Sequence, residues 1–144
     1  TDVLTSGKIT ASGFINSSIY LVNTYYEELG GYVIEISASG KHGIVVAMQD
    51  QGALDWYQAT NLLSNSDNHD TAGAEFKDWR LPAKRELDLM HEQRVAVGNF
   101  TTNYYWSSTE YDNYYAWGQF FSNGGQSIDD SKNYTASVRA VRAF

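Results

Sequence analysis

The sequence contains no cysteine. A disulfide framework and a thiolate metal site are therefore both excluded, so the fold must rest on its hydrophobic core alone. The chain has 144 residues, which fits a single domain. A domain of this size buries about two thirds of the surface that its unfolded chain exposes, so it needs no covalent staple.

Positive charge is scarce as well. Ten Lys and Arg residues stand against 17 Asp and Glu residues, and the formal net charge is −7. A surface that binds nucleic acid needs clustered Lys and Arg to contact phosphates, so we expect no nucleic-acid partner. No apolar run approaches the roughly 20 residues that a membrane helix requires, so we also expect no direct insertion into a membrane.

Aromatic residues, by contrast, are abundant. The chain holds eleven Tyr and four Trp residues but a single Pro, and six of the Tyr residues lie after residue 103. Tyrosine offers a large contact area, a polar tip and few side-chain torsions to immobilise, which is why binding surfaces favour it. This enrichment makes residues 111–137 the first candidate for a binding surface.

Two β-branched runs in the first half of the chain predict a β-hairpin. They span residues 32–36 and 42–47, and residues 39–41 between them carry the turn signal Ser-Gly-Lys. Residues 1–29 show only scattered apolar positions. We expect them to form an N-terminal extension packed on the domain, with one strand around residues 13–22.

Two helices are expected in the middle of the chain. Apolar residues recur at helical spacing within residues 53–63, and Pro82 precedes a second such stretch at residues 83–94. Between them, residues 64–73 are rich in Ser, Asn and Asp and are expected to form a surface loop. Short strands are expected at three later positions: residues 104–107, 116–121 and 137–142. Two helices among short, mostly non-sequential strands favour an α+β fold class over a doubly wound parallel sheet.

Three segments of the chain resemble one bacterial family. They are Gly30-Gly31-Tyr32-Val33-Ile34 with His42-Gly43, then Trp79-Arg80-Leu81-Pro82-Ala83-Lys84-Arg85-Glu86-Leu87, and finally Tyr105-Trp106-Ser107-Ser108-Thr109-Glu110 with Val138-Arg139-Ala140-Val141-Arg142. They resemble the C-type-lectin-like domains related to the C-terminal domain of the Legionella collagen-like adhesin. The resemblance covers residues 30–144 and implies a C-type-lectin-like fold, in the variant that formylglycine-generating enzymes use. It also implies a ligand-binding domain that lies outside the cell or on its surface.

The formylglycine-generating enzymes share the Trp79–Pro82 segment. Those enzymes need catalytic cysteines, and this chain has none, so their activity is excluded. Another catalytic set is conceivable, because Ser107, His91 and Asp88 could supply a nucleophile, a base and an acid. No nucleophile-elbow pattern surrounds any serine, however, and we expect the protein not to be an enzyme.

A metal site has one candidate in the sequence. Residues 67–70 place several oxygen donors within one loop, as calcium requires. Their spacing differs from that of calcium loops, and the Glu-Pro-Asn motif of calcium-dependent sugar lectins is absent, so we favour a solvated polar loop and expect no metal or cofactor. Three tryptophans are interpreted as core residues: Trp79, Trp106 and Trp117. At least one of Arg139 and Arg142 is expected to make structural hydrogen bonds.

The closing segment resembles the variable proteins that retroelements diversify. In such proteins, mutation of adenines in Asn codons randomises chosen positions and can never produce Trp, Met, Gln, Glu or Lys. Seven positions are taken as scaffold: Ala116, Trp117, Gln119, Phe121, Gly124, Gln126 and Lys132. Twenty positions remain, and none is one of those five types. They are Tyr111, Asp112, Asn113, Tyr114, Tyr115, Gly118, Phe120, Ser122, Asn123, Gly125, Ser127, Ile128, Asp129, Asp130, Ser131, Asn133, Tyr134, Thr135, Ala136 and Ser137.

Strand alternation divides the same segment for an independent reason, because successive side chains of a strand point to opposite faces. One face is predicted to be buried and carries Trp117, Gln119 and Phe121. The other face is predicted to be exposed and exchangeable and carries Gly118, Phe120 and Ser122. An ordinary half-buried strand explains the alternation but not an outward Phe120.

These observations predict a ligand-binding protein of receptor or adhesin type, with residues 111–137 as its diversified surface. Five aromatic residues are expected to anchor the ligand: Tyr111, Tyr114, Tyr115, Phe120 and Tyr134. Lys132 is expected to pair with a scaffold carboxylate or carbonyl. The expected partner is a protein or glycan on another cell surface, and the protein itself would lie on a bacterial cell or a phage particle. Two alternatives stay open: a non-diversified adhesin for cell-surface glycans, and a structural module of a surface or phage-tail assembly.

Overall fold

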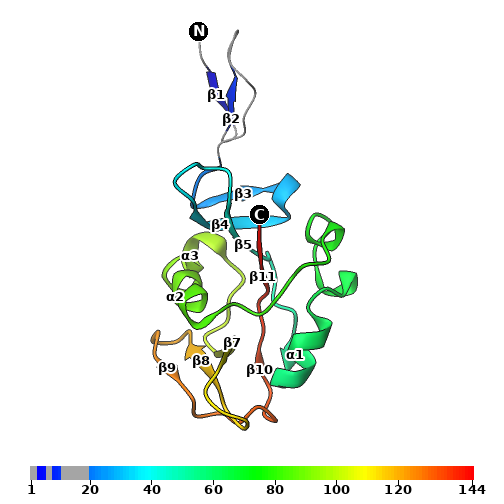
Figure 1. Ribbon diagram of the computed structural model, residues 1–144, viewed down its shortest axis with the longest axis vertical. Coiled ribbons are helices and arrows are strands. Elements are labelled where there is room, and N and C mark those ends of the chain that lie inside the picture. Colours follow the sequence, from blue (N-terminus) through cyan, green and yellow to red (C-terminus); the bar gives the residue numbers. More distant parts are fainter. Residues whose placement is uncertain (1–2, 6–7, 11–19) are drawn as a thin grey trace.

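The computed structural model describes residues 3–5, 8–10 and 20–144 (Figure 1). Within these residues it contains α-helices and largely antiparallel β-sheets, which confirms the α+β class. β1 (Val3–Thr5) and β2 (Lys8–Thr10) pair with each other in a separate two-stranded sheet. No helix in the described part of the chain is long and apolar enough to cross a membrane.

The first of the two larger sheets is antiparallel and has the strand order β11-β5-β4-β3. Its strands are β3 (Thr24–Tyr26), β4 (Gly31–Ile36), β5 (Gly43–Val46) and β11 (Val141–Ala143). β4 and β5 form the predicted hairpin, and the side chains of Val33 and Val45 are fully buried. Gly31 must be glycine, because a Cβ there would lie 2.3 Å from the carbonyl oxygen of Val46.

The second sheet has the strand order β6-β10-β7-β8-β9. Its strands are β6 (Ala53–Leu54), β7 (Tyr104–Glu110), β8 (Ala116–Phe120), β9 (Gln126–Ser127) and β10 (Ala136–Ser137). β10 runs parallel to β7, whereas the other neighbours are antiparallel. Tyr105 and Trp106 are both fully buried but belong to different core clusters, because neighbouring strand residues face opposite ways. β7 therefore contributes to the core on both faces of this sheet.

Helix α2 (Lys84–Glu92) packs against both sheets, through β4 on one side and through β7 and β8 on the other. Leu87 and Met90 form the buried stripe of α2, and both lie in the same core cluster. A short helix that the sequence did not predict, α3 (Arg94–Val97), follows it. Because α2 lies against β8, it fixes the position of the predicted binding segment relative to the core.

Helix α1 (Trp56–Leu62) is shorter than the predicted helix over residues 53–63, since residues 53–54 form strand β6 instead. A capping box fixes its start: the Asp55 carboxylate accepts a hydrogen bond from the amide of Gln58, and the Gln58 side chain accepts one from the amide of Asp55. The helix buries Ala59 against the core. The start of α1 is consequently fixed directly after β6, the strand that pairs with β10.

An ion pair connects the Trp-Arg-Leu-Pro segment to helix α2. The guanidinium of Arg80 donates to both carboxylate oxygens of Glu86, at 2.7 and 2.9 Å, and the amide of Ala83 donates to the same carboxylate at 2.8 Å. Burial alone would raise the pKa of Glu86, but these hydrogen bonds outweigh it and hold the pKa below its ordinary value. The pair ties the loop before α2 to the first turn of the helix.

Two sequence predictions of strands need correction. The single strand expected over residues 137–142 is wrong, because the chain leaves one sheet at β10 and enters the other at β11, and residues 138–140 cross between them. The amide of Val138 donates to Gly52, and Ala140 accepts from Ala47, so the crossing is hydrogen-bonded along its length. The strand expected around residues 13–22 lies mostly outside the described residues, and residues 20–22 are not in a strand.

The expected N-terminal extension supplies part of the core. Tyr26 in β3 and Leu29 in the 3-10 helix η1 (Glu27–Leu29) are buried in the same cluster as Trp106. Residues 24–29 are therefore continuous with the first larger sheet.

The polar stretch over residues 64–73 is not the plain solvated loop that we expected. It contains the 3-10 helix η2 (Ser66–Asn68) and the start of η3 (Gly73–Glu75). The ring of His69 is buried, stacks on Trp79 with centroids 4.7 Å apart, and has its Nε2 hydrogen-bonded to the carbonyl of Leu63. Burial lowers the pKa of His69 below its ordinary value of 6.5, although the Leu63 carbonyl acts in the opposite direction.

This buried histidine predicts a loss of stability at mildly acidic pH. Because the pKa of His69 is lowered in the folded state, the unfolded chain binds more protons once the pH falls below about 6.5. We expect the urea midpoint to decline as the pH falls through about 6.5, the value in the unfolded chain, toward the lowered pKa of the folded state. Replacing His69 with Gln should flatten this decline. An identical decline in both proteins would show that other groups cause it.

Candidate functional site

The segment over residues 111–137 forms one end of the molecule, remote from the C-terminus (Figure 1). It contains the loop between β7 and β8, strand β8, the turn into β9, and the long loop between β9 and β10. Backbone contacts hold the β7–β8 loop beside the β9–β10 loop. Tyr115 forms a β-bridge with Ser131, and the amide of Lys132 donates to the carbonyl of Tyr114 at 2.8 Å. These two loops therefore lie together, whereas the turn into β9 is at the opposite end of β8.

Four tyrosines stand out on these loops by their exposure. Their exposed fractions are 57% for Tyr111, 71% for Tyr114, 36% for Tyr115 and 61% for Tyr134. We call these four residues the tyrosine surface. Large aromatic side chains that remain in solvent are unfavourable for an isolated domain, and several together on one face are typical of an interaction surface.

A buried lysine holds the tyrosine surface together. Lys132 is 3% exposed, and its Nζ donates to the carboxylate of Glu110 at 2.6 Å and to the carbonyl of Asp112 at 2.8 Å. The prediction that Lys132 pairs with a scaffold carboxylate or carbonyl is confirmed. Since Glu110 ends β7 and Asp112 lies in the loop that follows, one ammonium group fixes both loops to the strand.

The same lysine connects the loops to helix α1. Its carbonyl accepts a hydrogen bond from the amide of Trp56 at 3.0 Å, and its Nζ lies 4.6 Å from the centroid of the Trp56 ring. The indole nitrogen of Trp56 donates in turn to the carbonyl of Ser107 in β7. Residue 132 is thus bonded to β7, to the loop before β8 and to α1.

The loop before β8 is also ordered from within. One carboxylate oxygen of Asp112 accepts hydrogen bonds from the amides of Tyr114 and Tyr115, both at 2.8 Å. The amide of Tyr111 donates to the carbonyl of Tyr115, which closes the loop. The exposed tyrosines therefore extend from a backbone that is already folded, which reduces the entropy lost when they bind.

The scaffold face of β8 packs as the alternation predicts. Gln119 and Phe121 are buried: the Gln119 amide donates to Asp88 of α2, and Phe121 contacts the ring of His91. Trp117 is only half-buried and lies beneath the Nζ of Lys84 at 3.6 Å. Of the three tryptophans expected in the core, Trp79 and Trp106 are buried and Trp117 lies at its border.

The opposite face of β8 differs from the prediction. Gly118 is buried under the ring of Tyr104, where a Cβ would lie 2.2 Å from a ring carbon, so this conformation accepts no side chain at position 118. Phe120 is half-buried against the same ring, with centroids 4.8 Å apart. Tyr104 keeps its place by donating its hydroxyl to the carbonyl of Ser127 at 2.9 Å, and burial raises its pKa to about 12. On this face only Ser122 is exposed as expected.

The remaining predicted positions divide by exposure. Ala136 and Ser137 are buried in β10, between β6 and β7, and cannot reach a partner. Seven positions besides the tyrosines and Ser122 are exposed: Asp112, Asn113, Asn123, Gly125, Asp129, Asn133 and Thr135. Four are half-buried: Ser127, Ile128, Asp130 and Ser131. Gly118, Ala136 and Ser137 are therefore removed from the predicted contact surface.

One residue near this surface was not predicted from the sequence. Tyr57, in the first turn of α1, is 45% exposed, and its ring contacts that of Trp56 with centroids 5.6 Å apart. Since Trp56 is bonded to Lys132, Tyr57 lies next to the loop that carries Tyr134. Nothing local in the sequence indicates which surface Tyr57 joins, because the contact of α1 with the Lys132 loop is set by the tertiary fold.

The other sequence candidates are used elsewhere in the structure. The hydroxyl of Ser107 is buried and donates to the carbonyl of Trp117, His91 packs on Phe121, and Asp88 accepts from Gln119. Residues 67–70 serve local structure, since the Asp70 carboxylate accepts from the amide of Gly73. Within the described residues, no group of three or more His, Asp or Glu side chains is placed to hold a metal ion.

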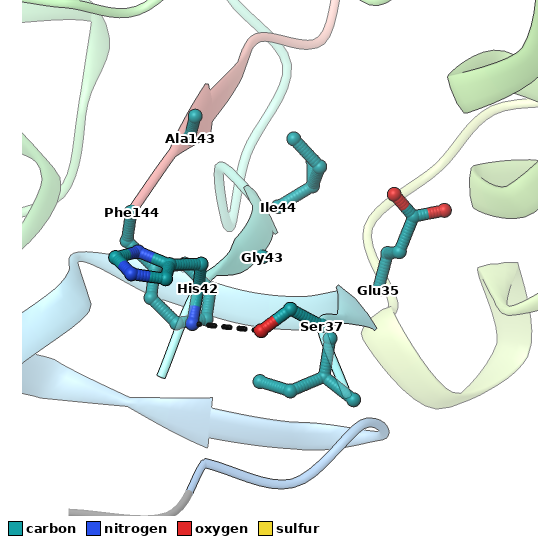
Figure 2. A pocket seen from close by; sticks show the side chains of 8 residues that line it. Glu35, Ser37, His42, Gly43, Ile44, Ala143 and Phe144 are labelled. Carbon is teal, nitrogen blue, oxygen red and sulfur yellow. Dashed lines mark hydrogen bonds between the residues drawn. The ribbon is translucent and has the colours of Figure 1, made fainter. Parts of the chain in front are cut away.

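A shallow hollow of about 470 Å³ lies beside the C-terminus, away from the tyrosine surface, and Figure 2 shows its lining. It is formed by the ends of β4 and β5 and by the last residues of the chain, including Phe144. Its polar groups serve the fold: the Ser37 hydroxyl accepts from the amide of His42, and the Glu35 carboxylate pairs with Arg85. None of the predicted site residues lines it.

The fold and the site together define a small α+β domain that displays an ordered, tyrosine-rich loop surface. Comparison with known families then gives its relationship: the model of the Lcl C-terminal domain matches residues 35–142, and the chain belongs to that family. The resemblance to the C-terminal domain of the Legionella collagen-like adhesin is thereby confirmed. The family suggests an adhesin-like, surface-binding role. No curated protein matches the chain.

Proposed function

We propose that this protein is a ligand-binding domain of adhesin type, with the tyrosine surface as the centre of its binding site. The observation that carries the proposal is the gathering of four exposed tyrosines on loops that the buried Lys132 holds in place. Aromatic anchors on an ordered backbone supply most of the energy of such interfaces, while neighbouring Asp, Asn and Ser side chains adapt to polar groups of the partner. Phe120 contributes through its packing on Tyr104 rather than as an anchor.

Within this proposal the domain has the C-type-lectin-like fold that its family resemblance implies. The two larger sheets, with α2 packed against both and long loops at one end, are compatible with that fold. The protein acts by binding and not by catalysis. It lies on a cell surface, and its partner is a molecule on another surface.

The exposed loop positions are further proposed to be diversified by a retroelement. Twelve of the twenty positions expected to vary are exposed, among them the four residues of the tyrosine surface. Inspection of the flanking DNA tests this directly. A near-copy of the final segment with adenines at the variable codons, beside a reverse-transcriptase gene, is expected; its absence would favour the non-diversified, glycan-binding adhesin.

Removing two anchors should weaken binding strongly while leaving the fold intact. Tyr114 and Tyr134 are the most exposed of the four, so their joint replacement with Ala should change the free energy of unfolding by less than about 1 kcal/mol. Ligands are first selected from a glycan array and a displayed protein library with the unaltered domain. Their affinity for the double variant should fall at least about 30-fold.

The matched control replaces Tyr25 and Val95 with Ala, since both are exposed but lie on β3 and α3. This variant should bind as the unaltered domain does. Full binding by the Tyr114 and Tyr134 variant would show that the site lies elsewhere. A domain that selects nothing from either collection would instead be a structural module of a larger assembly.

A further inference from the structure

The exposed charges on the loops that carry the tyrosine surface are negative. Between residues 95 and 138 the chain has four acidic residues and a single basic one, Lys132. That lysine is buried and its ammonium is already bonded to Glu110, so it presents no positive charge to a partner. Asp112 and Asp129 are exposed on the same loops as the tyrosines, and Asp130 is half-buried beside them.

Two carboxylates lie adjacent in the loop after β9. Asp129 and Asp130 follow one another, and their negative charges add to the effect of burial, which is the main cause of the raised pKa of Tyr104. The pKa of Asp130 is raised, by burial first and by Asp129 second. Two negative groups that already repel each other bind a cation more favourably than either would alone.

Lys84 of α2 is the cation that lies beside this surface. Its Nζ is 3.6 Å from the centroid of the Trp117 ring, on the face of β8 that points away from Phe120. The ring of Tyr111 also contacts Trp117, with centroids 6.2 Å apart. Lys84 therefore marks one border of the tyrosine surface, and the acidic residues occupy the loops on the other side.

Resting on the proposed function, we propose that the partner is a protein surface rich in Lys and Arg, bound by the exposed tyrosines together with Asp112, Asp129 and Asp130. Tyrosine rings attract ammonium and guanidinium groups through their faces, and the carboxylates supply direct ion pairs. Tyr57 of α1 is a further exposed aromatic residue, and it follows Trp56, whose amide is bonded to Lys132 of the same loop as Tyr134. A sulfated or otherwise anionic glycan would meet like charge on these loops and is disfavoured.

Nuclear magnetic resonance titration of the isotope-labelled domain tests the charge of the partner. Three probes are compared: a peptide of alternating Arg and Gly, its counterpart of alternating Glu and Gly, and heparin fragments. Only the basic peptide should shift the amide signals of residues 111–115 and 127–134. Raising the salt concentration from about 50 to about 300 mM should weaken its binding several-fold, because the Debye length falls below about 10 Å.

Variants that replace acidic residues with their amides test which carboxylates bind the basic peptide. Joint replacement of Asp129 and Asp130 with Asn should weaken binding of the basic peptide about fivefold. The matched control replaces Asp67 and Glu92 with Asn and Gln, since these acids are exposed on η2 and α2, and it should leave the affinity unchanged.

Several outcomes would overturn the inference. Signal shifts in these loops with heparin or with the acidic peptide would show that the surface does not select positive charge. Equal weakening by both pairs of variants would show attraction to the net charge of the whole molecule. In either case the proposed function is tested separately. That test is whether the library screen selects ligands and whether the Tyr114 and Tyr134 variant loses affinity for them.

Discussion

Replacing Arg139 with Met is expected to lower the free energy of unfolding by about 3–5 kcal/mol, because it breaks a buried ion pair from one side. The side chain of Arg139 is fully buried where the chain crosses between the two larger sheets. Its Nε donates to the carboxylate of Asp50 at 2.7 Å, and its two terminal nitrogens donate to the carbonyls of Ala47 and Asn99 at 2.9 and 2.6 Å. The change would remove the donor from all three acceptors, of which the Ala47 carbonyl is buried and the Asp50 side chain is 20% exposed.

Asp50 would suffer most from this change. Its other oxygen accepts the hydroxyl of Tyr105, whose pKa is raised to about 12, by burial first. Without Arg139 the carboxylate keeps that hydroxyl bond but loses its counter-charge. Replacing Arg139 with Lys should recover little, since an ammonium group cannot reach acceptors on opposite sides of a planar guanidinium.

Chemical denaturation of Arg139→Met and Arg139→Lys measures the loss in the free energy of unfolding. An exposed ion pair serves as the reference. Arg85 pairs with Glu35 at the surface, where the side chains are 62% and 38% exposed, so replacing Arg85 with Met should cost less than about 1 kcal/mol. If the Met variant at position 139 fails to fold, Asp50→Asn provides a milder test of the same network. Equal midpoints for the variants at positions 139 and 85 would contradict the structural role of Arg139.

The parts of the fold that the sequence predicts are those whose signals are local. The hairpin of β4 and β5 combines β-branched runs with a Ser-Gly-Lys turn, and both strands form within a residue or two of their predicted bounds. Helix α2 follows from Pro82 and from the spacing of Leu87 and Met90. In each case residues a few positions apart determine the structure, so pattern is sufficient.

The errors arise where distant residues decide. Residues 137–142 carry a continuous strand pattern, yet the pairing of β10 with β7 and of β11 with β5 divides them between two sheets. His69 sits in a stretch that is polar by composition, and only the ring of Trp79 and the carbonyl of Leu63 make it a core residue. Such partners are invisible to periodicity because they are set by the tertiary fold.

The candidate site shows the same division. Alternation along β8 correctly separates Gln119 and Phe121 from Gly118 and Phe120. It could not reveal that Tyr104, opposite Phe120 on β7, covers the second face and closes position 118. The exposed part of this segment therefore lies mainly on the loops before β8 and after β9 rather than on the strand, which is why the proposed anchors are the loop tyrosines and not Phe120.

Replacing Lys132 with Met is the second large change, and it tests how the tyrosine surface is built. The methionine keeps most of the buried stem but removes the ammonium that bonds Glu110 and the carbonyl of Asp112. Because that carbonyl loses its donor while Glu110 can turn to solvent, with a side chain already 58% exposed, we expect a loss of about 2–4 kcal/mol. The loops carrying Tyr114 and Tyr134 should loosen together. Limited proteolysis with chymotrypsin would then cut at these tyrosines well before the rest of the domain unfolds.

Two further variants test whether the effect comes from the hydrogen bonds of the Lys132 ammonium or from the loss of any positive charge. The exposed Lys77, replaced with Met in the same way, should change neither stability nor cleavage. The stability and the cleavage rate of Glu110→Gln should lie between those of the Lys132 and Lys77 variants, since Lys132 retains its carbonyl partners. If the Lys132 variant were as stable and as resistant to cleavage as the Lys77 variant, the tyrosines would have to be ordered by the loops alone, and Lys132 would have no role in holding them.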